Sequence, residues 1–221
     1  MSNLKAYILN PHANQNANYT SWMLDCPVEC KLVKTAIHAW EPPDDTGIVI
    51  THMHYRWDEI SALRQIYEST QIPILILADG ILEYRNTWQN PTIADGSIFQ
   101  PMIGHKLACI GNSQARHIES WGNDGKCEVT GLPRFDSVFN SEYLPVRKEG
   151  PFRLLIATAN SPAFDALQRN RVVQSIRALQ QRFEKHPQIN QRPIEVTWRL
   201  TDGLHEELNL PRHPNKSTRQ H

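Results

Sequence analysis

Short apolar runs rich in β-branched residues alternate with helical stretches along most of this chain, and this alternation constrains the fold more than any other feature. Strands separated by helices indicate βαβ units. Near-continuous apolar runs are typical of parallel strands that are covered on both faces. The sequence therefore predicts an α/β fold with a Rossmann-like, doubly wound parallel sheet. The runs that predict its strands are Lys5–Leu9, Lys31–Ile37, Gly47–Thr51, Pro73–Ala78, Lys106–Ile110 and Cys127–Thr130.

Two stretches between these runs carry the periodicity of amphipathic helices. Trp57–Ser69 repeats apolar residues at helical spacing, with charged residues on the opposite face. Asn112–Trp121 predicts a second helix, and Asn112 or Ser113 is suited to cap its N-terminus.

The strand–helix pattern breaks over residues 141–151, where prolines, a glycine and mixed charges predict a linker. Residues 1–140 then form an N-terminal Rossmann-like domain, and 211–221 form a disordered polar tail. Residues 152–210 predict only two strands and two helices, which bury too little surface for an independent domain of this type. We therefore interpret this part as the incomplete start of a second Rossmann-like domain, whose exposed apolar surface favours self-association. Its predicted elements are strand Phe152–Thr158, helix Ala163–Lys185 with Pro162 near its first position, strand Ile194–Arg199 and helix Asp202–Leu208.

Composition excludes several classes of function. Lys and Arg total 23 and Asp and Glu total 23, so no overall positive field favours a nucleic-acid partner. No apolar run approaches the roughly 18 residues of a transmembrane helix, and the N-terminus lacks a signal peptide, so we expect a cytoplasmic protein. The four cysteines have no disulfide or metal spacing and predict buried, reduced thiols. Neither a G-x-G-x-x-G nor a P-loop motif is present.

In parallel sheets, ligands bind beyond the carboxyl ends of the strands, and the loop after the fourth predicted strand is the richest in chemistry. Asp79 directly ends the most apolar strand, where desolvation raises a carboxyl pKa and suits the group to general-base catalysis. Gly80 permits a close turn, while Glu83, Arg85 and Asn86 supply a second carboxylate, a phosphate-binding cation and an amide. Alternatively, Asp79 caps the next helix, and Glu83 and Arg85 form a local salt bridge.

An H-x-H pair, His52 and His54, follows the third predicted strand and resembles the start of the metallo-β-lactamase motif. That motif continues with Asp and His, where this chain has Arg56 and Trp57. Half of the ligand set is missing and a positive charge replaces it, so we expect no metal site. His52 is better interpreted as a neutral hydrogen-bonding group that lines the cleft.

The other strand ends carry polar residues that suit a sugar or a phosphate. Amide-rich loops recognise hydroxyl groups, and the N-terminus of a helix attracts anions. Each of these positions has a simpler structural interpretation as a turn residue, a helix cap, a rigid turn or a surface arginine. The candidate substrate-binding residues in these loops are His12, Asn112, Ser113, Arg134, Thr158, Asn160 and Arg199.

Three segments, in this order and at this spacing, resemble a known enzyme family. They are LADGILEYRNTW (77–88), LACIGNSQARHIESWGN…CEVTGLPRFDSV (107–138) and FRLLIATANSPAF (152–164). Together they resemble the inverting, metal-independent glycosyltransferases of the GT-B fold that build bacterial surface and capsular polysaccharides. This group is similar to the UDP-N-acetylglucosamine 2-epimerases and the CDP-glycerol glycerophosphotransferases. The resemblance covers roughly residues 47–200, and V-T-G-x-P-R-F-D and D-G-x-x-E-x-R-N are its most specific strings.

The resemblance implies a two-domain enzyme, cytoplasmic or peripheral at the inner membrane face, with its active site between the domains. The N-terminal domain would hold a glycan or lipid-linked acceptor and supply the catalytic base, best matched by Asp79 and next by Glu83. The second domain would bind a nucleotide sugar through Thr158, Asn160 and Arg199, with the donor as a substrate and no cofactor or metal.

The chain stops before the segments that make most donor contacts in such enzymes, so the resemblance also implies a C-terminally truncated form that binds the donor weakly or not at all and is weakly active or inactive. Two alternatives stay open. One is a sugar-nucleotide epimerase or hydrolase on the same scaffold, and the other is a non-catalytic module that binds a glycan or a partner.

Overall fold

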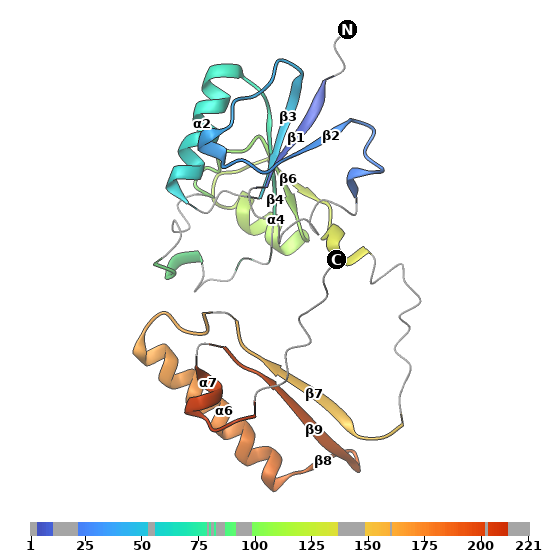
Figure 1. Ribbon diagram of the computed structural model, residues 1–221, viewed down its shortest axis with the longest axis vertical. Coiled ribbons are helices and arrows are strands. Elements are labelled where there is room, and N and C mark those ends of the chain that lie inside the picture. The colour runs from blue at the N-terminus through green and yellow to red at the C-terminus, as the bar shows by residue number, and fades with distance from the viewer. Residues whose placement is uncertain are drawn as a thin grey trace. The chain divides into compact units, whose positions relative to one another are not determined.

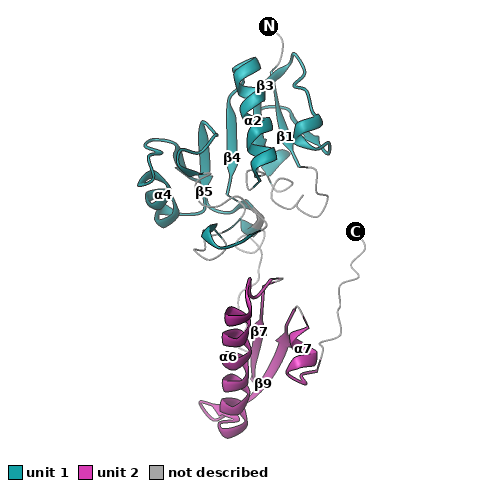
Figure 2. Ribbon diagram, turned by 90° about the vertical axis from the view of Figure 1, so that its left-hand side faces the viewer, with its two compact units in different colours: residues 1–144 teal, residues 145–221 magenta. Residues whose placement is uncertain are grey.

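The computed structural model describes residues 4–10, 22–52, 56–78, 80, 82, 87–91, 99–136, 149–159, 161–201 and 203–211. The chain divides into two compact units, Met1–Leu144 and Pro145–His221 (Figure 2). This division falls inside the segment 141–151 in which the sequence predicts a linker, although residues 137–148 lie outside the described part. Within the described residues, no helix combines the length and the hydropathy that crossing a membrane requires.

The first unit contains a six-stranded sheet in which every pair of neighbouring strands is parallel. Its strand order is β2-β1-β3-β4-β5-β6. With its flanking helices, this sheet confirms the predicted α/β, Rossmann-like fold class (Figure 1). The strands are β1 (Lys5–Leu9), β2 (Cys30–Val33), β3 (Thr46–Thr51), β4 (Ile74–Leu77), β5 (Lys106–Cys109) and β6 (Cys127–Val129).

The strand order places most of the connections on one face of the sheet. The connections β2→β3, β3→β4, β4→β5 and β5→β6 all run toward the same edge, whereas β1→β2 runs toward the other. Parallel crossovers are right-handed in about 98% of cases, so the four connections that share a direction share a face. The elements within them are η2 (Ile37–Ala39), α2 (Trp57–Thr70) and α4 (Asn112–Glu119).

We call this the helix-covered face, and it carries the main hydrophobic core. Val49 and Ile76 of the sheet are fully buried there, together with Leu63 of α2 and the nearly fully buried Ile118 of α4. The 14-residue helix α2 ends at Thr70, and its C-cap Gln71 adopts a left-handed conformation with a φ of 59°. This burial agrees with the apolar stripe that the sequence predicts for α2.

The opposite face, which we call the pocket face, is packed differently. Ala6, Ile8 and Ile50 form a smaller buried cluster there, against which Trp22 and Met23 of the β1→β2 connection are packed. Further along the sheet on this face, the side chains of β4 are only half-buried.

Among the boundaries that differ from the sequence-based expectation, the end of β2 and the N-cap of α4 have a clear physical reason. β2 ends at Val33 and not at residue 37, because the chain turns at polar residues and Ile37 enters the core from the 3-10 turn η2. The N-cap of α4 is Gly111, which provides no side-chain cap, so the prediction of Asn112 or Ser113 as the cap was wrong. Both residues instead lie in the first turn of the helix.

The second unit has a three-stranded sheet of order β7-β9-β8, in which β7 and β9 are parallel and β8 is antiparallel to β9. α6 packs through Val173 and Ile176 against Trp198 and Leu200 in a separate core. The elements are β7 (Phe152–Ala157), α6 (Ala166–Lys185), β8 (Gln188–Ile189), β9 (Arg192–Arg199) and α7 (Leu204–Glu207).

Two features of the second unit correct the prediction. The helix begins at Ala166, with Asp165 as an N-cap that accepts a hydrogen bond of 2.8 Å from the Gln168 N–H, so Pro162 is not its first position. β8 was not predicted, because it is two residues long. Asn190 and Gln191 between β8 and β9 have φ angles of 49° and 64°, which gives a tight hairpin turn.

Candidate functional site

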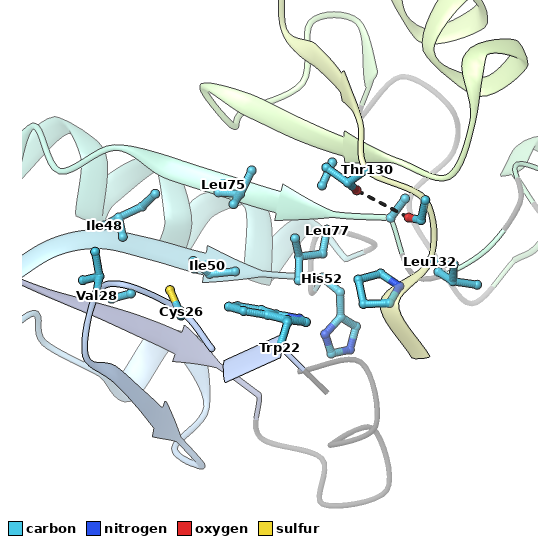
Figure 3. Close-up of a pocket in the computed structure, with 15 residues that line it drawn as sticks. Trp22, Cys26, Val28, Ile48, Ile50, His52, Leu75, Leu77, Thr130 and Leu132 are labelled. Atoms are coloured by element: carbon cyan, nitrogen blue, oxygen red, sulfur yellow. Dashed lines mark hydrogen bonds between the residues drawn. The ribbon is translucent and has the colours of Figure 1, made fainter. Parts of the chain in front are cut away.

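Two polar residues stand at the carboxyl edge of the first unit's sheet, where the sequence predicts the site. Asn10 directly follows β1 and His52 directly follows β3, and each is only 1% exposed. The Thr51 hydroxyl donates to the Leu9 carbonyl over 3.4 Å, which ties the ends of these two neighbouring strands together. His52 therefore lies on a rigid part of the scaffold, and its ring lines the pocket described below (Figure 3).

The loop after β4 is connected to the start of α4 by the side chain of Gln114. Its Nε2 donates to the Gly80 carbonyl over 3.1 Å, and its Oε1 accepts a 2.8 Å hydrogen bond from the Ile110 N–H. The Ala78 N–H donates to the Ala108 carbonyl over 3.0 Å, so the strand pairing of β4 and β5 extends to the residue just before the loop. Gly80 is thus placed beside the N-terminal end of α4.

Sequence reasoning did not select Gln114, although a signal was present. Gln114 is the third residue of α4, and Glu or Gln at this position commonly reaches back to backbone N–H groups before the helix. Asn112 and Ser113 occupy the first two positions of α4 with exposed side chains. Backbone N–H groups in a first turn have no partner within the helix and favour an anion. This edge can therefore bind a negatively charged group.

A pocket of about 370 Å³ occupies the pocket face of the sheet. Its floor is formed by side chains of the central strands, among them Ile48, Ile50 and Leu75 (Figure 3). The β1→β2 connection forms one wall, and the segment after β6 forms the other. The residues of these walls are Trp22, Cys26 and Val28 on one side and Thr130, Gly131, Leu132 and Pro133 on the other.

The predicted residues of the second unit are engaged by the fold itself. The Thr158 hydroxyl accepts a 3.0 Å hydrogen bond from the Thr201 N–H and lies 2.9 Å from the Thr201 hydroxyl. The Thr201 hydroxyl also donates to the Ala159 carbonyl. These bonds join the chain segments that follow β7 and β9. Arg199, the last residue of β9, pairs with Ala157 and has an exposed side chain.

The structure therefore describes only part of the predicted site. In the first unit, His52, Gly80, Asn112 and Ser113 all lie at the carboxyl edge of one sheet, and Arg134 belongs to the 3-10 turn Pro133–Phe135. Thr158 and Arg199 lie in the second unit. The predicted residues outside the described part of the chain are His12, Asp79, Glu83, Arg85, Asn86 and Asn160.

The four cysteines are free, but the prediction that they are buried holds only for Cys109, because the other three are half-buried. Burial, reinforced by a hydrogen bond with Cys127, raises the pKa of Cys109 to about 12. Burial and a hydrogen bond with Cys26 raise the pKa of Cys30 to about 11. Neither Cys109 nor Cys30 therefore supplies a thiolate nucleophile at neutral pH.

Across the residues that the structure describes, no group of three His, Cys, Asp or Glu side chains is arranged to hold a metal ion. His54 of the H-x-H pair is outside those residues. The chain matches no protein-family model, and comparison with curated proteins gave no match.

Proposed function

We propose that this chain is a metal-independent, inverting glycosyltransferase that uses a nucleotide sugar, of the type that builds surface polysaccharides. The observation that carries the proposal is the position of the D-G-x-x-E-x-R-N string. It begins two residues after the end of β4, a central strand of the parallel sheet, and Gln114 holds its Gly80 carbonyl beside the N-terminal end of α4. Parallel α/β sheets bind their ligands beyond the carboxyl ends of their strands.

In the proposed reaction, Asp79 acts as the general base and removes the proton from an acceptor hydroxyl. The resulting oxygen attacks the anomeric carbon of the nucleotide sugar, the bond from that carbon to the diphosphate breaks, and the configuration inverts. The nucleoside diphosphate leaves with the bonding electron pair. Helix N-termini such as that of α4, together with Arg side chains, stabilise its negative charge.

The test is a donor screen with the full chain. A panel of UDP-, GDP- and CDP-sugars is incubated with and without candidate acceptors, and release of the nucleoside diphosphate is measured. We expect release that depends on the acceptor. Asp79→Asn should lower kcat by at least about a hundredfold, because a general base contributes 10²–10⁴-fold to the rate.

The matched control is Asp124→Asn, which makes the same chemical change at an exposed residue of the turn before β6. It should stay within about twofold of the wild type, because surface substitutions of this kind have small effects. Asp79→Asn turnover within a few-fold of wild type would refute the assignment of the base. Failure of every donor to bind by calorimetry would refute the transferase itself. Release of nucleotide without any acceptor would instead favour the epimerase or hydrolase alternative.

A further inference from the structure

The pocket on the pocket face is a long apolar trough that follows the strands. None of its fifteen lining residues is an Asp, Glu, Lys or Arg. Along β3 it extends from Ile48 past Ile50 to His52, a rise of about 13 Å for four residues of strand. Such a shape favours a ligand that is extended and apolar over most of its length.

The volume of the trough limits what it can hold. An apolar cavity of about 150 Å³ stays dry and binds a benzene molecule. A pocket of about 370 Å³ is roughly two and a half times larger and therefore holds on the order of fifteen carbons. It also falls within the size of ordinary small-molecule sites, which span roughly 300–1,000 Å³. A pocket of this volume suits a single chain better than a packed helix about 10 Å wide.

The two ends of the trough differ in polarity. At the end toward the start of β3, the lining is formed by Ile48 and Val28, and Val28 is 40% exposed. At the carboxyl edge, the lining includes His52 and Thr130, whose hydroxyl donates to the Gly131 carbonyl over 3.4 Å (Figure 3). The polar end is therefore the one at the carboxyl edge of the sheet.

We propose that this pocket binds the single hydrocarbon chain of an amphiphilic ligand and holds the ligand's polar head at the His52 end. The claim that this ligand is the acceptor substrate rests on the proposed function: the acceptor is lipid-linked, and its chain orients the reacting head group toward the carboxyl edge. The claim that the pocket binds a hydrocarbon chain rests on the pocket alone.

The experiment measures the affinity of the full chain for n-alkyl phosphates of 8 to 18 carbons, each below its micelle concentration, by calorimetry. Burial of each methylene should raise affinity about three- to fourfold until the pocket is full, and the gain should stop near fifteen carbons. Farnesyl phosphate, measured in parallel, shows whether a branched isoprenoid chain or a straight acyl chain fits better. Affinity that is independent of chain length, or that rises without a plateau, overturns the proposal.

Two variants test position and orientation. Leu75→Trp fills the middle of the trough and should weaken binding of every chain at least tenfold. Ile48→Trp fills only the end remote from His52, so it should leave octyl phosphate within twofold but move the plateau to shorter chains. Equal weakening of short and long chains by Ile48→Trp would overturn the orientation. Val28→Trp makes the same test at a half-exposed position, where a larger side chain is tolerated by the fold.

The matched control is Leu167→Trp on α6, where the leucine is 61% exposed and belongs to the second unit. The affinity of this variant for dodecyl phosphate should equal that of the wild type. A loss of affinity comparable to that of Leu75→Trp would overturn the assignment of chain binding to the pocket. The two proposals fail separately. Transfer to water-soluble acceptors without any chain binding refutes the pocket proposal alone, whereas chain binding without turnover of any donor refutes the transferase alone.

Discussion

The two faces of the six-stranded sheet are built from the same strands and the same kinds of side chain, yet they are packed very differently. On the helix-covered face, Val49 and Ile76 are completely buried beneath α2 and α4. On the pocket face, Ile48 and Leu75, their neighbours in sequence, are half-buried and line an open trough. The difference shows that the hydrophobicity of a strand does not decide how completely its two faces are covered.

Strand order and chain handedness account for this difference. Four successive right-handed crossovers run in one direction and place η2, α2 and α4 on one face. The β1→β2 crossover runs the other way, and of its described residues Trp22 and Met23 pack against the smaller cluster of the pocket face. An apolar strip over β3, β4 and β5 is therefore a consequence of topology and provides space for a ligand.

Thiol labelling should give the largest contrast between the two faces. Cys109 is fully buried and does not line the pocket. Its pKa is raised to about 12 from an ordinary 9.0, so at pH 8 its thiolate is about a thousandfold less populated than that of an ordinary cysteine. Cys26 lines the pocket and is half-buried. We expect iodoacetamide to modify Cys26 at least a thousandfold faster than Cys109, as followed by peptide mass spectrometry. Equal rates would contradict the assignment of Cys109 to a closed core.

The same Leu→Ala substitution on each face should lower the free energy of unfolding by different amounts. Leu63→Ala removes a fully buried side chain between α2 and the sheet and should destabilise the first unit by about 3 kcal/mol. Leu75→Ala widens a trough that is already open, so it should cost only about 1 kcal/mol. Urea unfolding, followed by a signal specific to the first unit, measures the free energy of unfolding of both variants. A cost for Leu75→Ala as large as that for Leu63→Ala would show that the pocket face is closed in solution.

The sequence predicted the elements of the first unit well because each apolar run coincides with a strand of the sheet, although the edge strands β2 and β6 contain no fully buried residue. β1 was predicted without error, and β4 and β5 were predicted to within one residue at either end. Periodicity, however, reports only whether a residue is buried and says nothing about which strands become neighbours. The order that leaves Leu75 and Ile48 on an open face could not be read from the residues.

The candidate site was predicted by location rather than by contacts. The rule that ligands bind at the carboxyl ends of parallel strands directed attention to His52 and Gly80, and both residues lie at that edge of the sheet. It could not select Gln114, because that side chain acts by joining two loops that are 30 residues apart in sequence, Gly80 and Ile110. Likewise, Thr158 was selected for its hydroxyl, but only the pairing of β7 with β9 brings Thr201 close enough to engage it.

The smallest expected effect is at the amino edge of the sheet, which belongs to neither face. The Asp45 carboxylate lies 2.8 Å from Lys5 Nζ and accepts a 2.8 Å hydrogen bond from the Tyr7 hydroxyl. The hydrogen bonds from Lys5 and Tyr7 hold the pKa of Asp45 below its ordinary value of 3.8. A carboxyl group whose pKa is lower in the folded than in the unfolded protein stabilises the fold at pH values above the unfolded pKa. This stabilisation is lost as the pH falls through the folded pKa.

Asp45→Asn should therefore lower the urea midpoint slightly at pH 5 to 7, by less than Leu75→Ala does, because the pair is close to solvent. The difference from the wild type should shrink below about pH 4 and disappear at lower pH, since the wild-type carboxylate is then protonated as well. High salt should reduce the difference in urea midpoint at neutral pH. The same variant should leave the labelling ratio of Cys26 to Cys109 unchanged. A change in that ratio would mean that the amino edge influences how the two faces are packed, and that strand order alone does not set their difference.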